Sequence, residues 1–272
     1  LEVTYGRYTA ACTWFEMITG QNVVGNPYAP ETIDPQVVKI AQNAAHYAVQ
    51  KPDEVTDMVN FKEPEIAGTD LKAPVYIDFG PTSLSATPWN NITSHQESST
   101  SSWIKDAENN YTNIGVRVLG GFTATHAGVG SEPASPVTVD GVEFPLTAWK
   151  DGLLVGGEKN KGDVGPGRIE ISQLDAARKY NFMILAIRFN GSKDARISSY
   201  KLVGKTESEV KKVKTGIKDV AAFNAAKFEE YIAKFENIEP DSEGKVIVEV
   251  KGIDTGLAAE GHINALCISP VK

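Results

Sequence analysis

The sequence predicts a mostly β protein, an antiparallel β-sandwich of jelly-roll type preceded by two α-helices. Helical periodicity is concentrated in about the first 50 residues. After residue 73, about eight short segments alternate apolar and polar residues, and Gly, Pro, Asn and Asp separate them. This pattern favours a sandwich, while a β-barrel remains the alternative.

Two amphipathic helices are expected within residues 1–52. The first covers residues 4–19, where aromatic and Cys side chains recur at spacings of three and four, and Gly20 follows as a stop. The second begins at Asp34 and Pro35, a good N-cap and first-turn pair, and ends before Pro52. Because each helix has only a narrow apolar face, the pair needs another partner to cover it.

Residues 53–72 have no periodicity and are interpreted as a linker, so residues 73–272 form the predicted sandwich. Its expected strands are Val75–Phe79, Gly115–Phe122, Val137–Phe144, Arg168–Ile171, Tyr180–Phe189, Ser198–Val203, Val246–Val250 and Ile263–Ile268. A late helix is indicated from Asp219 to Phe235. The tail of that segment, from Ala233, also alternates with period two and is equally consistent with a strand.

Composition excludes some functions. The 272 residues carry a formal net charge of −8, which disfavours binding to nucleic acid. No apolar run approaches the roughly 18 residues of a membrane span, although a leader or anchor is compatible with a longer parent protein. Cys12 and Cys267 lack metal-ligand spacing and are interpreted as buried apolar residues.

The first helix resembles the end of an SGNH-type ester hydrolase domain. The resemblance rests on Gly6-Arg7-Tyr8-Thr9-Ala10-Ala11, which in that family closely follows an Asp-x-x-His catalytic pair. It implies a hydrolase core upstream of Leu1 and makes residues 1–52 the helical remnant of that domain. The four histidines are scattered and no G-x-S-x-G motif occurs, so no catalytic residue is assigned within this chain and it is expected to be inactive.

The second part resembles the galactose-binding-domain-like β-sandwiches of bacterial secreted hydrolases. The segments that carry the resemblance are Tyr76-Ile77-Asp78-Phe79-Gly80, Pro88-Trp89-Asn90-Asn91-Ile92-Thr93, Leu174-Asp175, Tyr180-Asn181-Phe182, and Asn237-Ile238 with Pro240-Asp241-Ser242 and Gly244-Lys245-Val246. The resemblance implies a non-catalytic carbohydrate-binding module of a secreted, periplasmic or cell-surface bacterial esterase. A protein-binding or scaffold module is the alternative.

Trp89, Asn90 and Asn91 form the first candidate site. An indole offers a flat apolar face to a sugar ring, and carboxamides supply both donors and acceptors for hydroxyl groups. The alternative is that Trp89 plugs one end of the sandwich while the two asparagines cap a turn. Trp103 is a second candidate platform, whereas Trp149 is expected in the core.

Charged residues give weaker indications. Arg188 interrupts an apolar strand, so it either pairs with a buried carboxylate or faces a ligand. Asp78 alternates away from its apolar neighbours and is expected on the surface. Asp163, with Asp151, is a weak calcium candidate, and a structural calcium is compatible with the family resemblance. The basic stretch 193–219 is either a solvated hairpin or a surface for an acidic glycan.

Overall fold

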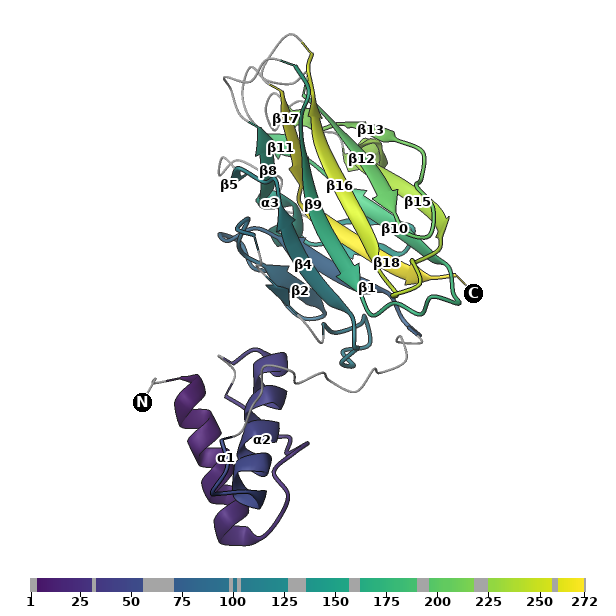
Figure 1. Cartoon of the computed structure of the whole chain (residues 1–272). Helices are drawn as coiled ribbons and strands as arrows, with labels where there is room; N and C mark the ends of the chain where they lie inside the picture. Colours follow the sequence, from purple (N-terminus) through teal and green to yellow (C-terminus); the bar gives the residue numbers. More distant parts are fainter. Residues whose placement is uncertain are drawn as a thin grey trace. The chain divides into compact units, whose positions relative to one another are not determined.

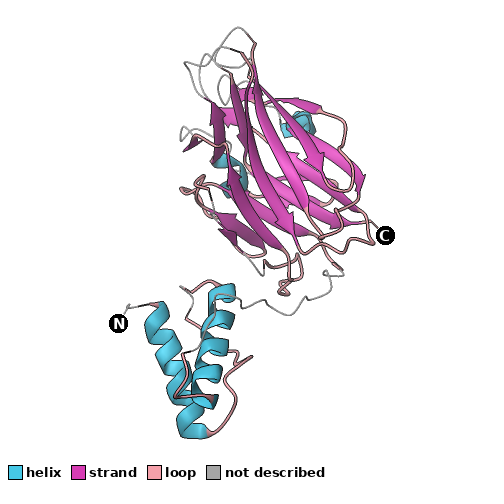
Figure 2. Ribbon diagram, viewed as in Figure 1, coloured by secondary structure: helices cyan, strands magenta, loops and turns pink. Residues whose placement is uncertain are grey.

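The computed structural model describes residues 4–30, 33–55, 71–97, 100–101, 104–126, 136–156, 162–189, 196–217, 225–255 and 259–271. The chain divides into two compact units, Leu1–Ile66 and Ala67–Lys272. The first is helical and the second is built almost entirely of strands (Figures 1 and 2). No helix in the described ranges has the length and apolar character needed to cross a bilayer.

The helical unit contains α1 (Tyr5–Thr19) and α2 (Pro35–Gln50), which confirms both predicted helices. Gly20 ends α1 in the left-handed conformation, with φ of 66°, and its N–H donates to the Glu16 carbonyl. A small core joins the two helices and their connection; its buried members are Tyr8, Cys12, Val23, Ile33, Ala41 and Ala45. Buried Glu16 accepts a hydrogen bond from the Val23 N–H and lies 2.6 Å from His46 Nδ1.

The strand unit contains two large sheets. The first has five strands in the order β15 (Ile232–Ile238), β10 (Tyr180–Leu185), β18 (Ala265–Pro270), β1 (Val75–Phe79) and β2 (Trp89–Ile92). The second has six, in the order β13 (Lys211–Lys214), β12 (Ile197–Val203), β16 (Val246–Ile253), β9 (Val164–Ser172), β4 (Gly115–Gly120) and β3 (Thr100–Ser101). Pairing within these sheets is antiparallel except between β1 and β2.

Smaller elements complete the unit. A three-stranded sheet has the order β17 (Glu260–Ile263), β8 (Gly152–Gly156) and β5 (Ala124–His126). Two-stranded pairs join β6 (Val137–Val139) to β7 (Val142–Phe144), and β11 (Arg188–Phe189) to β14 (Gly216–Ile217). The short helix α3 (Thr147–Lys150) and the 3₁₀ segment η2 (Ala225–Tyr231) also belong to this unit.

The five-stranded sheet is buried on both faces over much of its area. Along β18, Leu266 and Ile268 belong to the main core, whereas Ala265 and Cys267 belong to a second apolar cluster. Alternate residues of a strand point to opposite faces, so the two clusters lie on opposite sides of this sheet. The second cluster includes Trp149, which is 1% exposed, as the sequence predicts.

The predicted fold class is confirmed: sheets made mostly of antiparallel strands follow two N-terminal helices (Figure 2). Two details differ from expectation. The helix predicted to reach Phe235 ends at Tyr231, where η2 gives way to β15, so the period-two alternative was correct for this tail. Asp78 is 1% exposed and not on the surface, because the outer face of β1 is itself covered.

Candidate functional site

One row of side chains crosses the outer face of the five-stranded sheet. Cross-strand register aligns Lys234 with Met183, Met183 with Cys267, Cys267 with Tyr76, and Tyr76 with Trp89. The middle of this row is apolar, and its β15 end carries an ammonium group. In the adjacent row, Asn181 is paired with Ser269, which places a carboxamide beside a hydroxyl.

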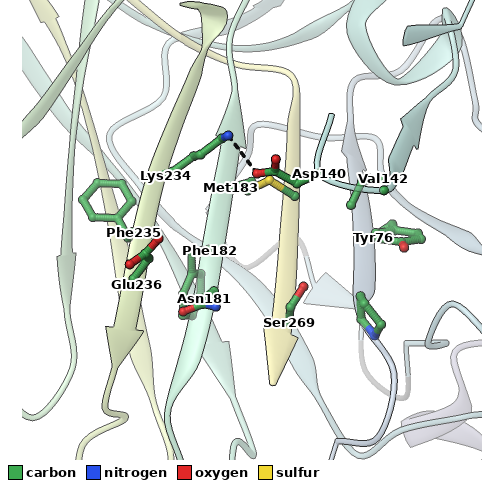
Figure 3. A pocket seen from close by; sticks show the side chains of 12 residues that line it. Tyr76, Asp140, Val142, Asn181, Phe182, Met183, Lys234, Phe235, Glu236 and Ser269 are labelled. Carbon is green, nitrogen blue, oxygen red and sulfur yellow. Dashed lines mark ion pairs between the residues drawn. The ribbon is translucent and has the colours of Figure 1, made fainter. Parts of the chain in front are cut away.

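A pocket of about 270 Å³ lies over these two rows. Figure 3 shows its lining: Pro74, Tyr76, Asp140, Gly141, Val142, Asn181, Phe182, Met183, Lys234, Phe235, Glu236 and Ser269. The turn between β6 and β7 contributes Asp140 and Gly141, and the large sheet provides most of the remainder. The pocket therefore combines an aromatic ring and a thioether with carboxamide, hydroxyl, ammonium and carboxylate groups.

The charged side of this pocket is an ion-pair cluster. Lys234 Nζ lies 2.7 Å from Asp140 and also pairs with Glu229 (Figure 3 draws the Asp140 pair). Although desolvation opposes it, hydrogen bonding to Asp140 and Glu229 raises the pKa of Lys234. Burial raises the pKa of Tyr76, so its phenol is neutral near pH 7 and offers one donor and one acceptor.

Trp89 lies next to this pocket and is 9% exposed. Its ring centroid is 5.2 Å from that of Tyr76 and 5.8 Å from that of Phe144. Trp89 thus supports the tyrosine that lines the pocket, and its environment corresponds to the alternative in which the indole plugs the fold. A stacking role for Trp89 stays a prediction that mutation decides.

Asn90 and Asn91 make hydrogen bonds to the backbone. Asn90 Nδ2 donates to the carbonyls of Tyr76 (2.9 Å) and Lys105 (2.8 Å), and its Oδ1 accepts from the Lys105 N–H. Asn91 Oδ1 accepts from the Ser85 N–H at 2.9 Å, and its Nδ2 donates to the Ser85 carbonyl. These carboxamides hold the connections around β2, so the structure brings them close to Trp89 but commits their polar atoms to the fold.

Arg188 lies in a different place, among buried charges. It is 3.0 Å from Glu260, which also pairs with Arg196 at 2.7 Å. This matches the first alternative from the sequence, pairing with a buried carboxylate. Burial opposes ionisation of Glu260, but the neighbouring His262 imidazole, 3.6 Å away, and the two arginines together lower its pKa to about 2. Trp103, the remaining candidate, falls outside the described residues.

Two buried histidines adjoin this cluster. The rings of His126 and His262 meet edge to face with centroids 5.0 Å apart. Burial lowers the pKa of both imidazoles, that of His262 to about 4. Both rings are therefore neutral at pH 7, and in the described part of the chain no hydrogen-bond partner reaches their nitrogens.

Asp78 and Asp151 form a second buried polar centre. Asp78 Oδ2 accepts from the Ser85 N–H, and Asp151 Oδ2 accepts from the N–H groups of Thr82 and Ser83 and from the Thr82 hydroxyl. Burial, together with repulsion from Asp151, raises the pKa of Asp78 to about 7. Within the described ranges, no group of three or more His, Cys, Asp or Glu side chains is arranged to hold a metal ion.

Asp163 and Asp151, the two calcium candidates from the sequence, contact different parts of the fold. Asp163 Oδ1 accepts a hydrogen bond from the Asp254 N–H, whereas Asp151 accepts hydrogen bonds from the connection after β1.

The described part of the basic stretch 193–219 forms the β12–β13 hairpin at the edge of the six-stranded sheet. Lys201 and Lys211 are paired there with Glu207 and Glu209, as expected for a solvated hairpin.

Sequence reasoning missed the pocket residues for an identifiable reason. Tyr76, Asn181, Met183 and Ser269 come from three strands that are far apart in sequence, and each resembles an ordinary strand residue on its own. The one available signal was alternation, because it places Tyr76 on the face opposite Val75 and Ile77. Strand order, which sequence alone does not supply, was needed to join them.

Comparisons with known proteins give limited likeness. A family model described as a domain of unknown function, DUF4886, matches residues 1–48. No curated protein matches the sequence. Among solved structures, TmCBM61 in complex with β-1,4-galactotriose aligns with 45% of this chain and 72% of its own, at 12% identity and a TM-score of 0.27.

Two further structures align over more of the chain. The Bacillus subtilis protein YXIM aligns with 73% of this chain and 40% of its own, at 13% identity and a TM-score of 0.36. The ANX2 ectodomain of Arabidopsis thaliana aligns with 74% of this chain and 49% of its own, at 10% identity and a TM-score of 0.41. The aligned region thus spans less than half of each of these two longer chains.

Proposed function

We propose that the strand unit is a non-catalytic carbohydrate-binding module whose site is the pocket on the five-stranded sheet. The observation that supports this best is the pairing of an apolar row with a polar row on one sheet face. A pyranose has one face of C–H groups and a rim of hydroxyls. Tyr76 and Met183 offer a surface for the first, and Asn181 and Ser269 offer partners for the second.

The charged groups of the pocket suit a glycan without net charge. Asp140 and Lys234 already neutralise each other, so they can hydrogen-bond hydroxyl groups without requiring a charged ligand. Glu236 adds an exposed acceptor at the same rim. Because strands carry most of the lining, the site is largely preformed, which reduces the entropy cost of binding a sugar.

The proposal places this module downstream of an SGNH-type esterase core in a secreted or cell-surface bacterial protein. The first helix supports it through its resemblance to the end of that hydrolase domain. The helix pair also exposes Trp14 (69%), Met17 (67%) and Ile18 (81%), apolar side chains that a hydrolase core would cover. Targeting the esterase to its substrate would then be the role of the strand unit.

A glycan array followed by calorimetric titration of the full chain tests the binding function. We expect the wild type to bind at least one glycan and Tyr76→Ala to weaken that binding by roughly tenfold or more, since one aromatic contact is lost. Tyr111→Ala removes an exposed tyrosine that does not line the pocket and serves as the matched control.

Absence of binding to any arrayed glycan would contradict the proposal and favour the scaffold alternative. Equal losses for Tyr76→Ala and Tyr111→Ala would exclude this pocket as the site. Tyr76→Phe keeps the ring against Trp89 and removes only the hydroxyl, so it separates stacking from hydrogen bonding.

A further inference from the structure

A second pocket lies on the outer face of the six-stranded sheet, over β13, β12 and β16, which are adjacent strands in Figure 1. Cross-strand register aligns Ser199 with Lys212 on one side and with Lys251 on the other. The strand neighbours Tyr200 and Val250 belong to the main core. Because alternate residues of a strand point to opposite faces, the lysine row (Lys212, Ser199 and Lys251) faces away from that core.

This pocket has a volume of about 250 Å³, similar to that of the pocket on the five-stranded sheet. All three side chains of the lysine row line it, so they reach one cavity. The rest of the lining is Asp163, Tyr200, Lys201, Val210, Glu249 and Ile253. Val210 is 57% exposed and Ile253 is half-buried, which adds an accessible aliphatic surface to the charged groups.

Both carboxylates of this pocket already have partners. Glu249 lies 2.9 Å from Arg168 and 3.4 Å from Lys201. Although burial opposes it, hydrogen bonding to Arg168 and the charge of Lys201 lower the pKa of Glu249. Asp163 Oδ1 accepts a hydrogen bond from the Asp254 N–H at 2.8 Å. These contacts draw both carboxylates away from the lysine row.

The lysine row itself has no anionic partner among the residues that the structure describes. None of their ion pairs includes Lys212 or Lys251. Ser199 is only 4% exposed, and no described residue hydrogen-bonds to its hydroxyl. Two ammonium groups and a hydroxyl donor therefore line one cavity together. An oxyanion suits this set, because its oxygens can accept from all three donors.

We propose that this pocket binds an acidic sugar, a hexuronate in the first instance, whose carboxylate lies between Lys212 and Lys251 and accepts from the Ser199 hydroxyl. Val210 and Ile253 then contact C–H groups of the sugar ring, which a bare inorganic anion does not possess. The site lies on the other large sheet from the pocket proposed above for an uncharged glycan. It therefore adds a second, charge-selective ligand and does not depend on the first site.

Amide NMR of the full ¹⁵N-labelled chain at low ionic strength tests this site, because surface ion pairs are screened by salt. The probes are the methyl glycosides of glucuronate and galacturonate, and their uncharged methyl esters are the matched ligand controls. At least one of the two acids should cause saturable shifts of the amide signals of Ser199, Lys212 and Lys251. Its ester should bind at least roughly tenfold more weakly, because it has no charge to pair with the ammonium groups.

Lys212→Gln and Lys251→Gln should each weaken binding of the acid by roughly tenfold, since each removes one charge-assisted contact. Lys214→Gln is the matched control, because Lys214 is exposed on the same strand and face as Lys212 but does not line the pocket. It should bind the acid as the wild type does. All three lysines are exposed, so the variants should fold.

Absence of saturable shifts at the lysine row with both acids would overturn the proposal. Equal binding of an acid and its ester would also overturn it, as would equal losses in Lys212→Gln and Lys214→Gln. Inorganic sulfate that shifts the same amide signals with the affinity of the acids would overturn the assignment to a sugar. Tyr76→Ala should leave the titration unchanged, so failure at this site is distinct from failure of the proposed glycan pocket.

Discussion

Replacing Trp89 by Ala distinguishes the two roles considered for this residue. The side chain is 9% exposed and contacts Tyr76 and Phe144. Removing roughly 200 Å² of buried apolar surface at about 25 cal/mol/Å² corresponds to an upper bound of about 5 kcal/mol. Truncations of buried tryptophan cost about 3 to 5 kcal/mol, which agrees with that figure.

Chemical denaturation monitored by circular dichroism measures this loss directly. A destabilisation of about 3 to 5 kcal/mol corresponds to a decrease of roughly 6 to 20 °C in melting temperature for a domain of this size. We expect Trp89→Phe to recover part of the loss, since a smaller ring still supports Tyr76. A change below about 1 kcal/mol, with glycan binding abolished, would refute the packing argument and restore Trp89 as a stacking platform.

Three further predictions concern acid stability, catalysis and autonomy. Burial lowers the pKa of His262 from about 6.5 in the unfolded chain to about 4 in the folded state. Between these two pH values the unfolded chain binds more protons than the folded one. The free energy of unfolding should therefore fall as pH decreases from 6.5 to 4. The pKa of His126 is lowered as well, so this residue should add to the loss of stability at acid pH. His262→Gln should make the free energy of unfolding, measured by denaturant titration, less dependent on pH. An unchanged pH dependence in this variant would contradict the role given to His262. The purified chain should hydrolyse no p-nitrophenyl ester, and turnover that an active-site titrant abolishes would contradict that expectation. Residues 67–272 expressed alone should be soluble and melt cooperatively, since they form their own compact unit, whereas aggregation would show that they need the helices.

The sequence was sufficient for elements with local signals. Asp34 and Pro35 precede or open α2, Gly20 closes α1, and period-two alternation located strands such as β1 and β16. The late segment was harder, because the Phe228–Phe235 region satisfies helical and strand spacing at once. Pairing of β15 with β10 decided it, and that pairing is a tertiary interaction.

The candidate site was less predictable because the five-stranded sheet is covered on both faces. From sequence, Asp78 opposite Ile77 implies a solvent-facing carboxylate, but the second apolar cluster and the connection after β1 enclose it. The same covering buries Trp89 and leaves Tyr76 partly accessible. No local pattern encodes that covering, since its parts come from β7, α3 and η2.

Methionine-methyl NMR tests the central claim, glycan binding at the Tyr76 pocket, most directly. The chain has three methionines, and Met183 lines the pocket while Met17 lies on α1 in the helical unit. Titration of ¹³C-methyl-methionine protein with the glycan selected on the array should shift the Met183 signal and leave that of Met17 unchanged. A glycan that binds by calorimetry but leaves the Met183 signal unmoved at saturation would contradict the claim.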